Sequence, residues 1–380
     1  MSMVTETPVD LLAREERGTK NDLFRDWPVL VAGALTFFAI AGYYRAIGFN
    51  VVRSDALHYL EWSHHFWIVE TGTHFPTYPF LLWLLRLASF GLLDGATLMQ
   101  TLTLSAYLAG IVVVGQILRH VNPAARRFGV IAYALFPFVG VMYAAYPVGD
   151  ALFGLILMSA LLALVKRAWL PFALCVGVGL ICHKALWMSL GLMSLYAWRR
   201  EGYPLKNLLL STLPLLGWYA WGYTHLTGLW MFRHHVQVHF TPKKLPIFDG
   251  MISPALSGGA KALAKTAYLL ALTATAGFLT YLNLRKKQYL WLAFTLPPLF
   301  MAVLLNTSVI WSMARFAKPL ALPLAIALLA VPVLTKALKN KAAQAAIVAV
   351  LALTQIVSAV YVDQFYFGES QRAGRVKAPR

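Results

Sequence analysis

Long runs of apolar residues recur along this chain, and short polar stretches separate them. Many of the runs hold about 18 to 22 residues, the length that an α-helix needs to cross a lipid bilayer. Clear examples are residues 28–50, 128–146 and 342–362. The pattern predicts an all-α, polytopic membrane protein.

The composition agrees with this prediction. Of the 380 residues, 59% are hydrophobic and 13% are charged, whereas an ordinary soluble domain carries about 25% charged residues. The formal net charge is +18, but the cations form short clusters between apolar runs and not one continuous face. Such spacing is typical of cytoplasmic loops that obey the positive-inside rule, and it favours anionic lipid over nucleic acid as a partner.

Placing the basic clusters in the cytoplasm gives one consistent threading of about eleven transmembrane helices. Residues 1–27 form a cytoplasmic N-terminal tail, residues 28–362 a single transmembrane domain and residues 363–380 a C-terminal tail. The spans are predicted at 28–48, 96–118, 128–147, 151–166, a pair within 169–198, 207–225, 261–283, 289–308, 316–334 and 342–362. Two outer loops cover about 49–95 and 226–260. We therefore expect a multi-pass protein of the plasma (inner) membrane.

Residues 75–93 are apolar enough to span, but a span here would put every later basic cluster outside. We interpret them as an amphipathic helix in the outer interface, with Arg86 toward water. The first outer loop then holds two juxtamembrane helices, at about 55–70 and 76–93.

Two carboxylates stand at the predicted outer boundary of the membrane. Asp55 follows the first span, and Asp150 lies in the outer turn before the span at 151–166. Ionisable residues are rare at this depth and are usually functional. The alternative for each is a helix N-cap, a role that is compatible with chemistry.

The same side of the predicted membrane carries cations that suit a phosphate. Lys184 stands between two apolar half-runs, and its alternative role is a turn residue that reaches the interface. Arg315 lies between the ninth and tenth spans and suits bidentate phosphate binding, with lipid anchoring as the alternative. Arg233 and His234 in the second outer loop form a candidate basic rim, unless that loop is only polar packing.

No cofactor is expected from the sequence, which contains no Gly-rich nucleotide fingerprint and no P-loop. The spacing of His58, Glu61 and His65, or of His235 and His239, leaves a metal open without matching a strong metal signature. Cys175 and Cys182 lie in one apolar run and favour buried thiols over a disulfide. An activated donor must then reach the site from within the membrane.

Together these segments resemble the GT-C glycosyltransferases, membrane enzymes that use polyprenyl-phosphate-linked sugars. Asp55 in VVRSDALHYLEWS is similar to the acidic residue that follows the first helix in that superfamily. THFPTYPFLLWLLR (73–86) resembles a segment of the GPI mannosyltransferase 2 group, of protein O-mannosyltransferases and of aminoarabinose transferases. YPVGDALF with Asp150, GLICHKALW with Lys184 and ARFAKPLALPLAIALL with Arg315 are similar to further segments of these enzymes.

The resemblance implies an inverting transfer of a sugar, mannose or another hexose or pentose, to a glycan, lipid or protein acceptor at the outer face. Asp55 would be the base, with Asp150 organising the site. Lys184 and Arg315, helped by Arg233 or His234, would bind the donor phosphate. Contacts to the acceptor or sugar are assigned to His58, Glu61, His65, His74 and Tyr78.

Two other functions remain open. A polymerase or ligase of lipid-linked glycans also pairs outer Arg and His with a polyprenyl diphosphate, but usually has its largest outer loop late in the chain. A transporter or flippase of lipid-linked sugars would account for the outer cations. It would also require charges deep within the helices, and these are nearly absent here.

Overall fold

The computed structural model describes residues 27–47, 55–64, 66, 75–121, 123, 126–135, 149–183, 186–225, 260–304 and 340–362. Within these ranges the regular structure is helical, without a strand, so the predicted all-α class is confirmed for them. Gly95–Val121 is the one described helix with the length and apolar composition to cross a membrane.

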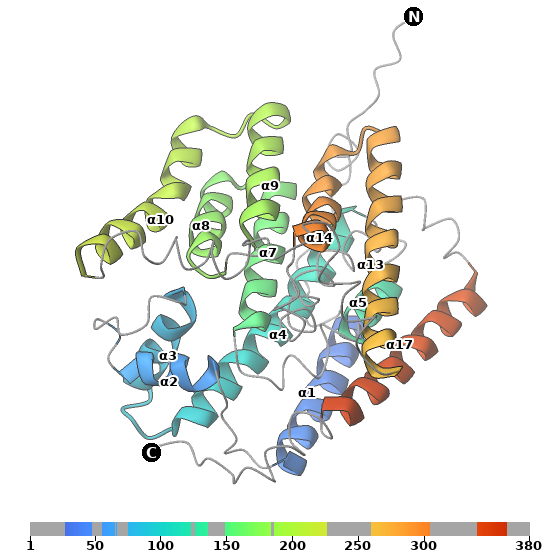
Figure 1. The fold of residues 1–380 in the computed structure, drawn as a ribbon, viewed down its shortest axis with the longest axis horizontal. Helices are drawn as coiled ribbons and strands as arrows, with labels where there is room; N and C mark the ends of the chain where they lie inside the picture. Colours follow the sequence, from blue (N-terminus) through green and yellow to red (C-terminus); the bar gives the residue numbers. More distant parts are fainter. Residues whose placement is uncertain are drawn as a thin grey trace, which may run out of the picture.

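The helices follow the apolar runs of the sequence (Figure 1). They are α1 (Trp27–Ile47), α2 (Asp55–His64), α3 (Thr77–Ala88), α4 (Gly95–Val121), α5 (Arg126–Leu135), α7 (Asp150–Val165), α8 (Trp169–Leu180), α9 (Leu186–Arg200), α10 (Leu205–His225), α13 (Ala260–Arg285), the 3-10 helix η3 (Tyr289–Trp291), α14 (Leu292–Leu304) and α17 (Lys341–Val362).

Most predicted spans coincide with a helix to within a few residues. The two expected juxtamembrane helices are present as α2 and α3, each shorter than predicted. The predicted pair within 169–198 is a hairpin of α8 and α9, whose 12 and 15 residues are fewer than the roughly 20 that a straight span needs. The predicted span at 316–334 and most of the one at 128–147 lie outside the described residues.

Three helices end in the same way, with a residue other than glycine in the left-handed conformation. Phe90, Arg167 and Lys287 have φ values of 51°, 52° and 57°. In each case the next residue donates its N–H to the carbonyl five positions earlier, as in Gln288 to Asn283 at 2.8 Å. This is the Schellman arrangement, which satisfies the last carbonyls of a helix and turns the chain back.

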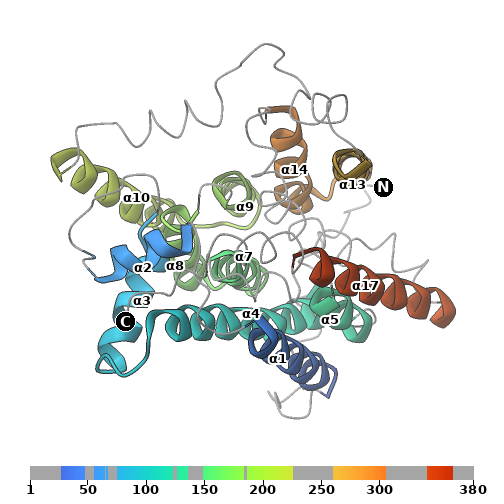
Figure 2. The ribbon, with the colours of Figure 1, turned by 60° about the horizontal axis from the view of Figure 1, so that its bottom comes forward.

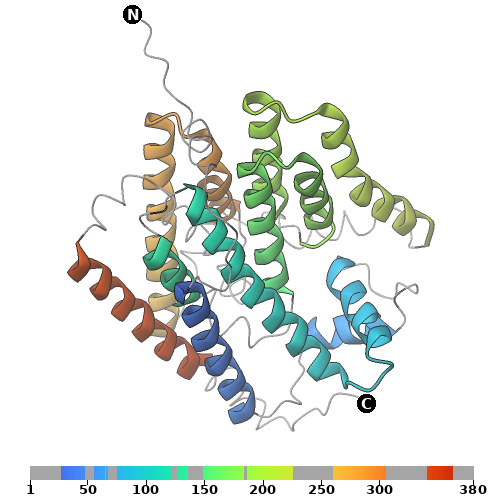
Figure 3. The same cartoon turned by 180° about the vertical axis from the view of Figure 1, so that it is seen from behind.

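Helix α4 organises the interior of the molecule. Figures 2 and 3 show α1 on one side of α4 and α7 on the other. Met99 and Ile111 of α4 and Leu157 of α7 are fully buried in the main hydrophobic core. The core therefore ties together segments that are far apart in the sequence.

Contacts between helix ends show which turns lie together at each end of the helical bundle. At the first end, the start of α1 meets the last turns of α4, because a Cβ on Gly115 would lie 2.8 Å from the side chain of Val29. Arg126, at the start of α5, donates from Nε to the Gly115 carbonyl at 3.1 Å. The α7–α8 turn meets the end of α9, which in turn meets η3 through Arg200 and Tyr289.

We call this first end the basic end, because most of the Lys and Arg residues that the structure describes lie there. Among the exceptions are Arg86 of α3 and Lys261 and Lys265 in the first turns of α13. Figure 1 shows the α9–α10 and α13–α14 turns of the basic end at the top, with α2 and α3 at the opposite end, the α2–α3 end. Glu201 is its only acidic residue among those described. The cations are Arg119, Arg126, Arg127, Lys166, Arg167, Arg199, Arg200, Lys206, Arg285, Lys286 and Lys287.

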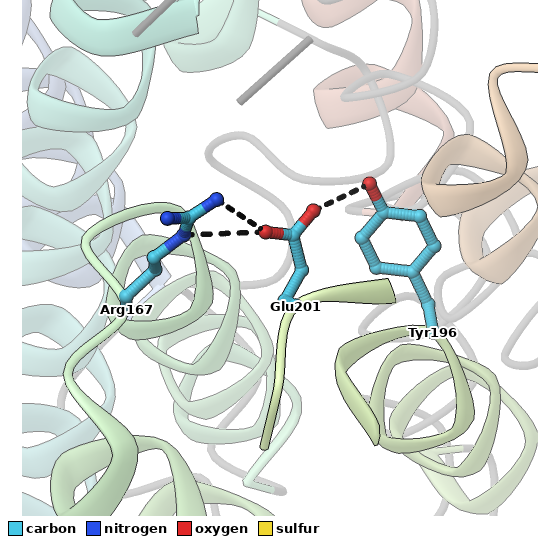
Figure 4. Close-up of polar contacts among 3 residues, drawn as sticks. All are labelled: Arg167, Tyr196 and Glu201. Atoms are coloured by element: carbon cyan, nitrogen blue, oxygen red, sulfur yellow. Dashed lines mark hydrogen bonds and ion pairs between the residues drawn. The ribbon is translucent and has the colours of Figure 1, made fainter. Parts of the chain in front are cut away.

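Glu201 joins two turns of the basic end (Figure 4). Its side chain is only 2% exposed. Arg167 donates to Glu201 Oε2 from Nη2 at 2.8 Å and from Nε at 3.2 Å, and the Tyr196 hydroxyl donates to Oε1 at 2.9 Å. Both carboxylate oxygens are thus paired, and the α7–α8 turn is fixed to the end of α9.

Removing one partner of this carboxylate should destabilise the fold. We expect Tyr196→Phe to lower the free energy of unfolding by about 1–3 kcal/mol, because a buried charged group loses a hydrogen bond. The exposed neighbour Lys166 provides the control, since Lys166→Gln should change it by less than about 0.5 kcal/mol. Denaturant unfolding of the purified protein measures both. Equal stabilities of the two variants would mean that the hydrogen bond from Tyr196 does not stabilise the buried Glu201 carboxylate.

Candidate functional site

Tyr78 lies at the junction of α2, α3, α4 and α7. Its ring meets that of Tyr59 edge-on, with 5.3 Å between the centroids. Its hydroxyl lies 3.4 Å from the carbonyl of Met99 and 3.2 Å from the hydroxyl of Thr103. On the other side, a Cβ on Gly149 would lie 3.2 Å from the ring. This single side chain therefore sets the start of α7 against α3.

The turn before Lys184 is held against the same helices. Thr77 at the start of α3 donates its hydroxyl hydrogen bond to the carbonyl of Ile181 at 2.9 Å. The ring of His183 stacks on that of Phe153, one turn into α7, with centroids 5.5 Å apart. The first turns of α3 and α7 thus position the turn between α8 and α9.

These contacts assemble sequence-predicted site positions at the α2–α3 end. Asp55 is the first residue of α2 and Asp150 is the first residue of α7. Tyr78 touches the residue before Asp150, and His183 precedes Lys184. The structure describes the backbone positions of both aspartates and not their side chains.

Six other predicted site residues lie outside the described residues, so the structure does not test their placement. They are His65, His74, Lys184, Arg233, His234 and Arg315.

Asp150 does not occupy the cap position of α7. The N-cap residue is Gly149, with φ of 81° and no side-chain cap hydrogen bond. The capping role considered for Asp150 therefore falls to a glycine, whose missing Cβ allows this left-handed turn. Asp150 is the first residue of the helix.

Tyr78 has a packing role in the structure. It is 2% exposed, and its polar atom faces α4. A sugar could reach it only if these contacts opened. His58 and Glu61, by contrast, have side chains that are 52% and 65% exposed and lie 3.8 Å apart.

Arg86 of α3 contacts His64 of α2 and so links the two helices. The Nε atom of Arg86 is buried without a hydrogen-bond partner, and burial lowers the pKa of its guanidinium group. Among the residues that the structure describes, no group of three or more His, Cys, Asp or Glu side chains could hold a metal ion.

An aromatic cluster beside the site was not anticipated from the sequence. It joins α2 and α3 to the second half of α10, since Trp62 and Trp218 lie 5.7 Å apart between ring centroids. Trp218 is 9% exposed, and its indole Nε1 has no hydrogen-bond partner. The signal in the sequence was the density of Trp and Phe around residues 62–83 and 218–221. The buried members are Trp62, Phe66, Phe75 and Trp218, with Phe80, Trp83, Ile181, Trp187 and Trp221 packed against them.

Comparison of the chain with protein-family models, with curated proteins and with solved structures finds no match.

The contact of Gly149 with Tyr78 gives a direct test of how α7 is positioned. Gly149→Ala should destabilise the protein twice over, because Ala is disfavoured at φ of 81° and its Cβ presses on the Tyr78 ring. Gly202 is the control, since it has φ of 74° and open space around a Cβ. We expect Gly202→Ala to lower the free energy of unfolding by about 1–2 kcal/mol, and Gly149→Ala by about 1 kcal/mol more.

Denaturant unfolding of both variants measures this difference. A Gly149→Ala variant as stable as Gly202→Ala would contradict the close packing of Tyr78 against the start of α7.

Proposed function

We propose that this chain is a polytopic membrane glycosyltransferase of the GT-C type. It transfers a sugar from a polyprenyl-phosphate donor at the outer face of the membrane. The observation that carries the proposal is the meeting of α2, α3, the start of α7 and the α8–α9 turn at one end, while the described basic turns lie at the other. Asp55, Asp150 and Lys184 belong to, or adjoin, those meeting segments.

The outward faces of the helices support a membrane environment. Five leucines of α10 are 50–59% exposed, and Leu170 and Leu174 of α8 are both 60% exposed. Extended apolar surfaces of this kind are rare on soluble monomers, and lipid would cover them. The five leucines are Leu205, Leu209, Leu210, Leu213 and Leu216.

The cations of the basic end indicate which end of the helical bundle faces the cytoplasm. Lys and Arg near the ends of spans favour the cytoplasmic side. With the basic end inside, the α2–α3 end faces outward, where a lipid-linked sugar that has crossed the membrane is available. The exposed apolar side chains of α3 and the turn after it, such as Leu87 and Phe90, then suit the outer interface.

The short α8 supports a recessed site. Its 12 residues rise about 18 Å from the basic end, whereas the hydrocarbon layer is about 30 Å thick. The α8–α9 turn would then lie about 12 Å below the outer boundary. A cation placed there, as Lys184 would be, meets the phosphate of a lipid-linked donor at the depth where few water molecules compete.

The proposed chemistry is a direct displacement at the anomeric carbon. The carboxylate of Asp55 accepts the proton of the acceptor hydroxyl, and the acceptor oxygen bonds to the anomeric carbon. The bond from that carbon to the phosphate oxygen breaks, and its electron pair leaves with the polyprenyl phosphate. Lys184 and Arg315 stabilise the charge that develops there, with Arg233 or His234. One displacement inverts the anomeric configuration.

Asp55→Asn tests the base. Asn keeps the size and the hydrogen-bonding shape but cannot accept the proton, so transfer should fall by about a hundredfold or more while folding and donor binding persist. The measurement is the release of polyprenyl phosphate from polyprenyl-phosphate mannose, and from the glucose and arabinose analogues, by membranes that contain the protein. Asp150→Asn is the matched variant and should lose less.

An Asp55→Asn protein with full transfer activity would remove the base from this mechanism. A wild-type protein that moves each of these donors across the membrane but releases no polyprenyl phosphate would indicate a transporter instead.

A further inference from the structure

Two segments of the basic end meet where the end of α9 reaches the turn after α13. The guanidinium group of Arg200, the last residue of α9, stands 5.5 Å from the centre of the Tyr289 ring. Tyr289 follows Gln288, whose N–H binds the carbonyl of Asn283 in the last turns of α13. Residues from two separate hairpins therefore converge at this point, away from the site at the α2–α3 end.

Buried polar atoms without partners underlie this point. Asn283 is 0% exposed and Thr280 is 7% exposed. Both amide atoms of Asn283, the hydroxyl of Thr280 and the Oε1 atom of Gln288 are buried without a hydrogen-bond partner. Thr280 and Asn283 are three residues apart and so lie on one face of α13. Buried polar groups nearly always have partners, so this group of atoms indicates a polar ligand.

The cations of these two turns indicate the charge of that ligand. None of them forms an ion pair with any residue that the structure describes. Arg200 contributes from α9, and Lys287 is fixed in the turn by its left-handed conformation, with φ of 57°. The full set is Arg199, Arg200, Arg285, Lys286 and Lys287.

We propose that the α9–α13 junction binds the headgroup of an anionic glycerophospholipid of the inner leaflet. The phosphodiester oxygens accept hydrogen bonds from Arg200 and Lys287. Because Asn283 is fully buried in the ligand-free structure, its Nδ2 donates to them only after the headgroup has opened the packing over it. The Oε1 atom of Gln288 can only accept, so it requires a donor, which a glycerol hydroxyl of the headgroup supplies. Exposed apolar side chains of α13, such as Phe278 and Leu284, lie beside the acyl chains.

This site rests on placing the basic end at the inner leaflet and does not depend on glycosyl transfer. Its readout is lipid binding. A protein without transferase activity could still show it, and a transferase could lack it.

The test uses the purified full-length chain in detergent, with phosphatidylglycerol as the probe and phosphatidylcholine as the zwitterionic control. Phosphatidylglycerol should raise the unfolding temperature in a saturable way, and phosphatidylcholine should not. In the double variant Arg200→Gln/Lys287→Gln the apparent Kd for phosphatidylglycerol should rise about 25-fold, because each cation removed should raise it about fivefold. Lys166→Gln removes a cation from the same end, outside this junction, and should leave the Kd unchanged.

Asn283→Leu distinguishes specific binding of the headgroup from non-specific attraction of an anionic lipid to the basic surface. It should unfold at the wild-type temperature or higher without lipid, because it removes unpaired buried atoms, yet bind phosphatidylglycerol about tenfold more weakly. Inorganic phosphate at the same concentrations should give no shift. The proposal is overturned if phosphate reproduces the shift, if Lys166→Gln weakens binding as much as the double variant, or if Asn283→Leu binds as wild type.

Discussion

Placing a charge among apolar side chains costs free energy, and this cost determines where charged residues stand in the fold. The chain limits it by collecting charged residues in turns and leaving leucine and phenylalanine on the outward helix faces. Where a carboxylate is buried at a turn, as in Glu201, both of its oxygens are paired. The two ends of the bundle thereby acquire different chemistry, cations at one and the candidate site at the other.

The packing of α7, α8 and α9 connects these two ends. The Arg167–Glu201 pair fixes the helices at the basic end. Thr77 and Tyr78 hold them at the other end, where the α8–α9 turn meets the start of α7. The short α8 lies between these two anchors, so the position of its turn is set from both sides. The position of the candidate site is therefore determined by the packing of several helices and not by a single loop.

Much of the helical pattern could be predicted from the sequence, because apolar runs and basic clusters mark helices and turns independently of tertiary contacts. α4, α10 and α13 agree with their predicted ranges to within three residues. Contacts between distant segments could not be predicted. Nothing local shows that Tyr78 packs beneath Gly149, that Gly149 replaces Asp150 as the cap, or that Trp62 meets Trp218. The base and phosphate-binding roles of Asp55, Lys184 and Arg315 stay predictions.

We infer that the α2–α3 end and the basic end face opposite sides of a membrane. In a background with Cys175→Ala and Cys182→Ala, one cysteine is introduced at each end, as Glu61→Cys or Lys286→Cys, both at exposed positions. A membrane-impermeant maleimide applied to intact cells whose outer surface is accessible measures the side directly. Glu61→Cys should be labelled at once, and Lys286→Cys only after the membrane is permeabilised. Labelling of both from the same side would contradict this orientation.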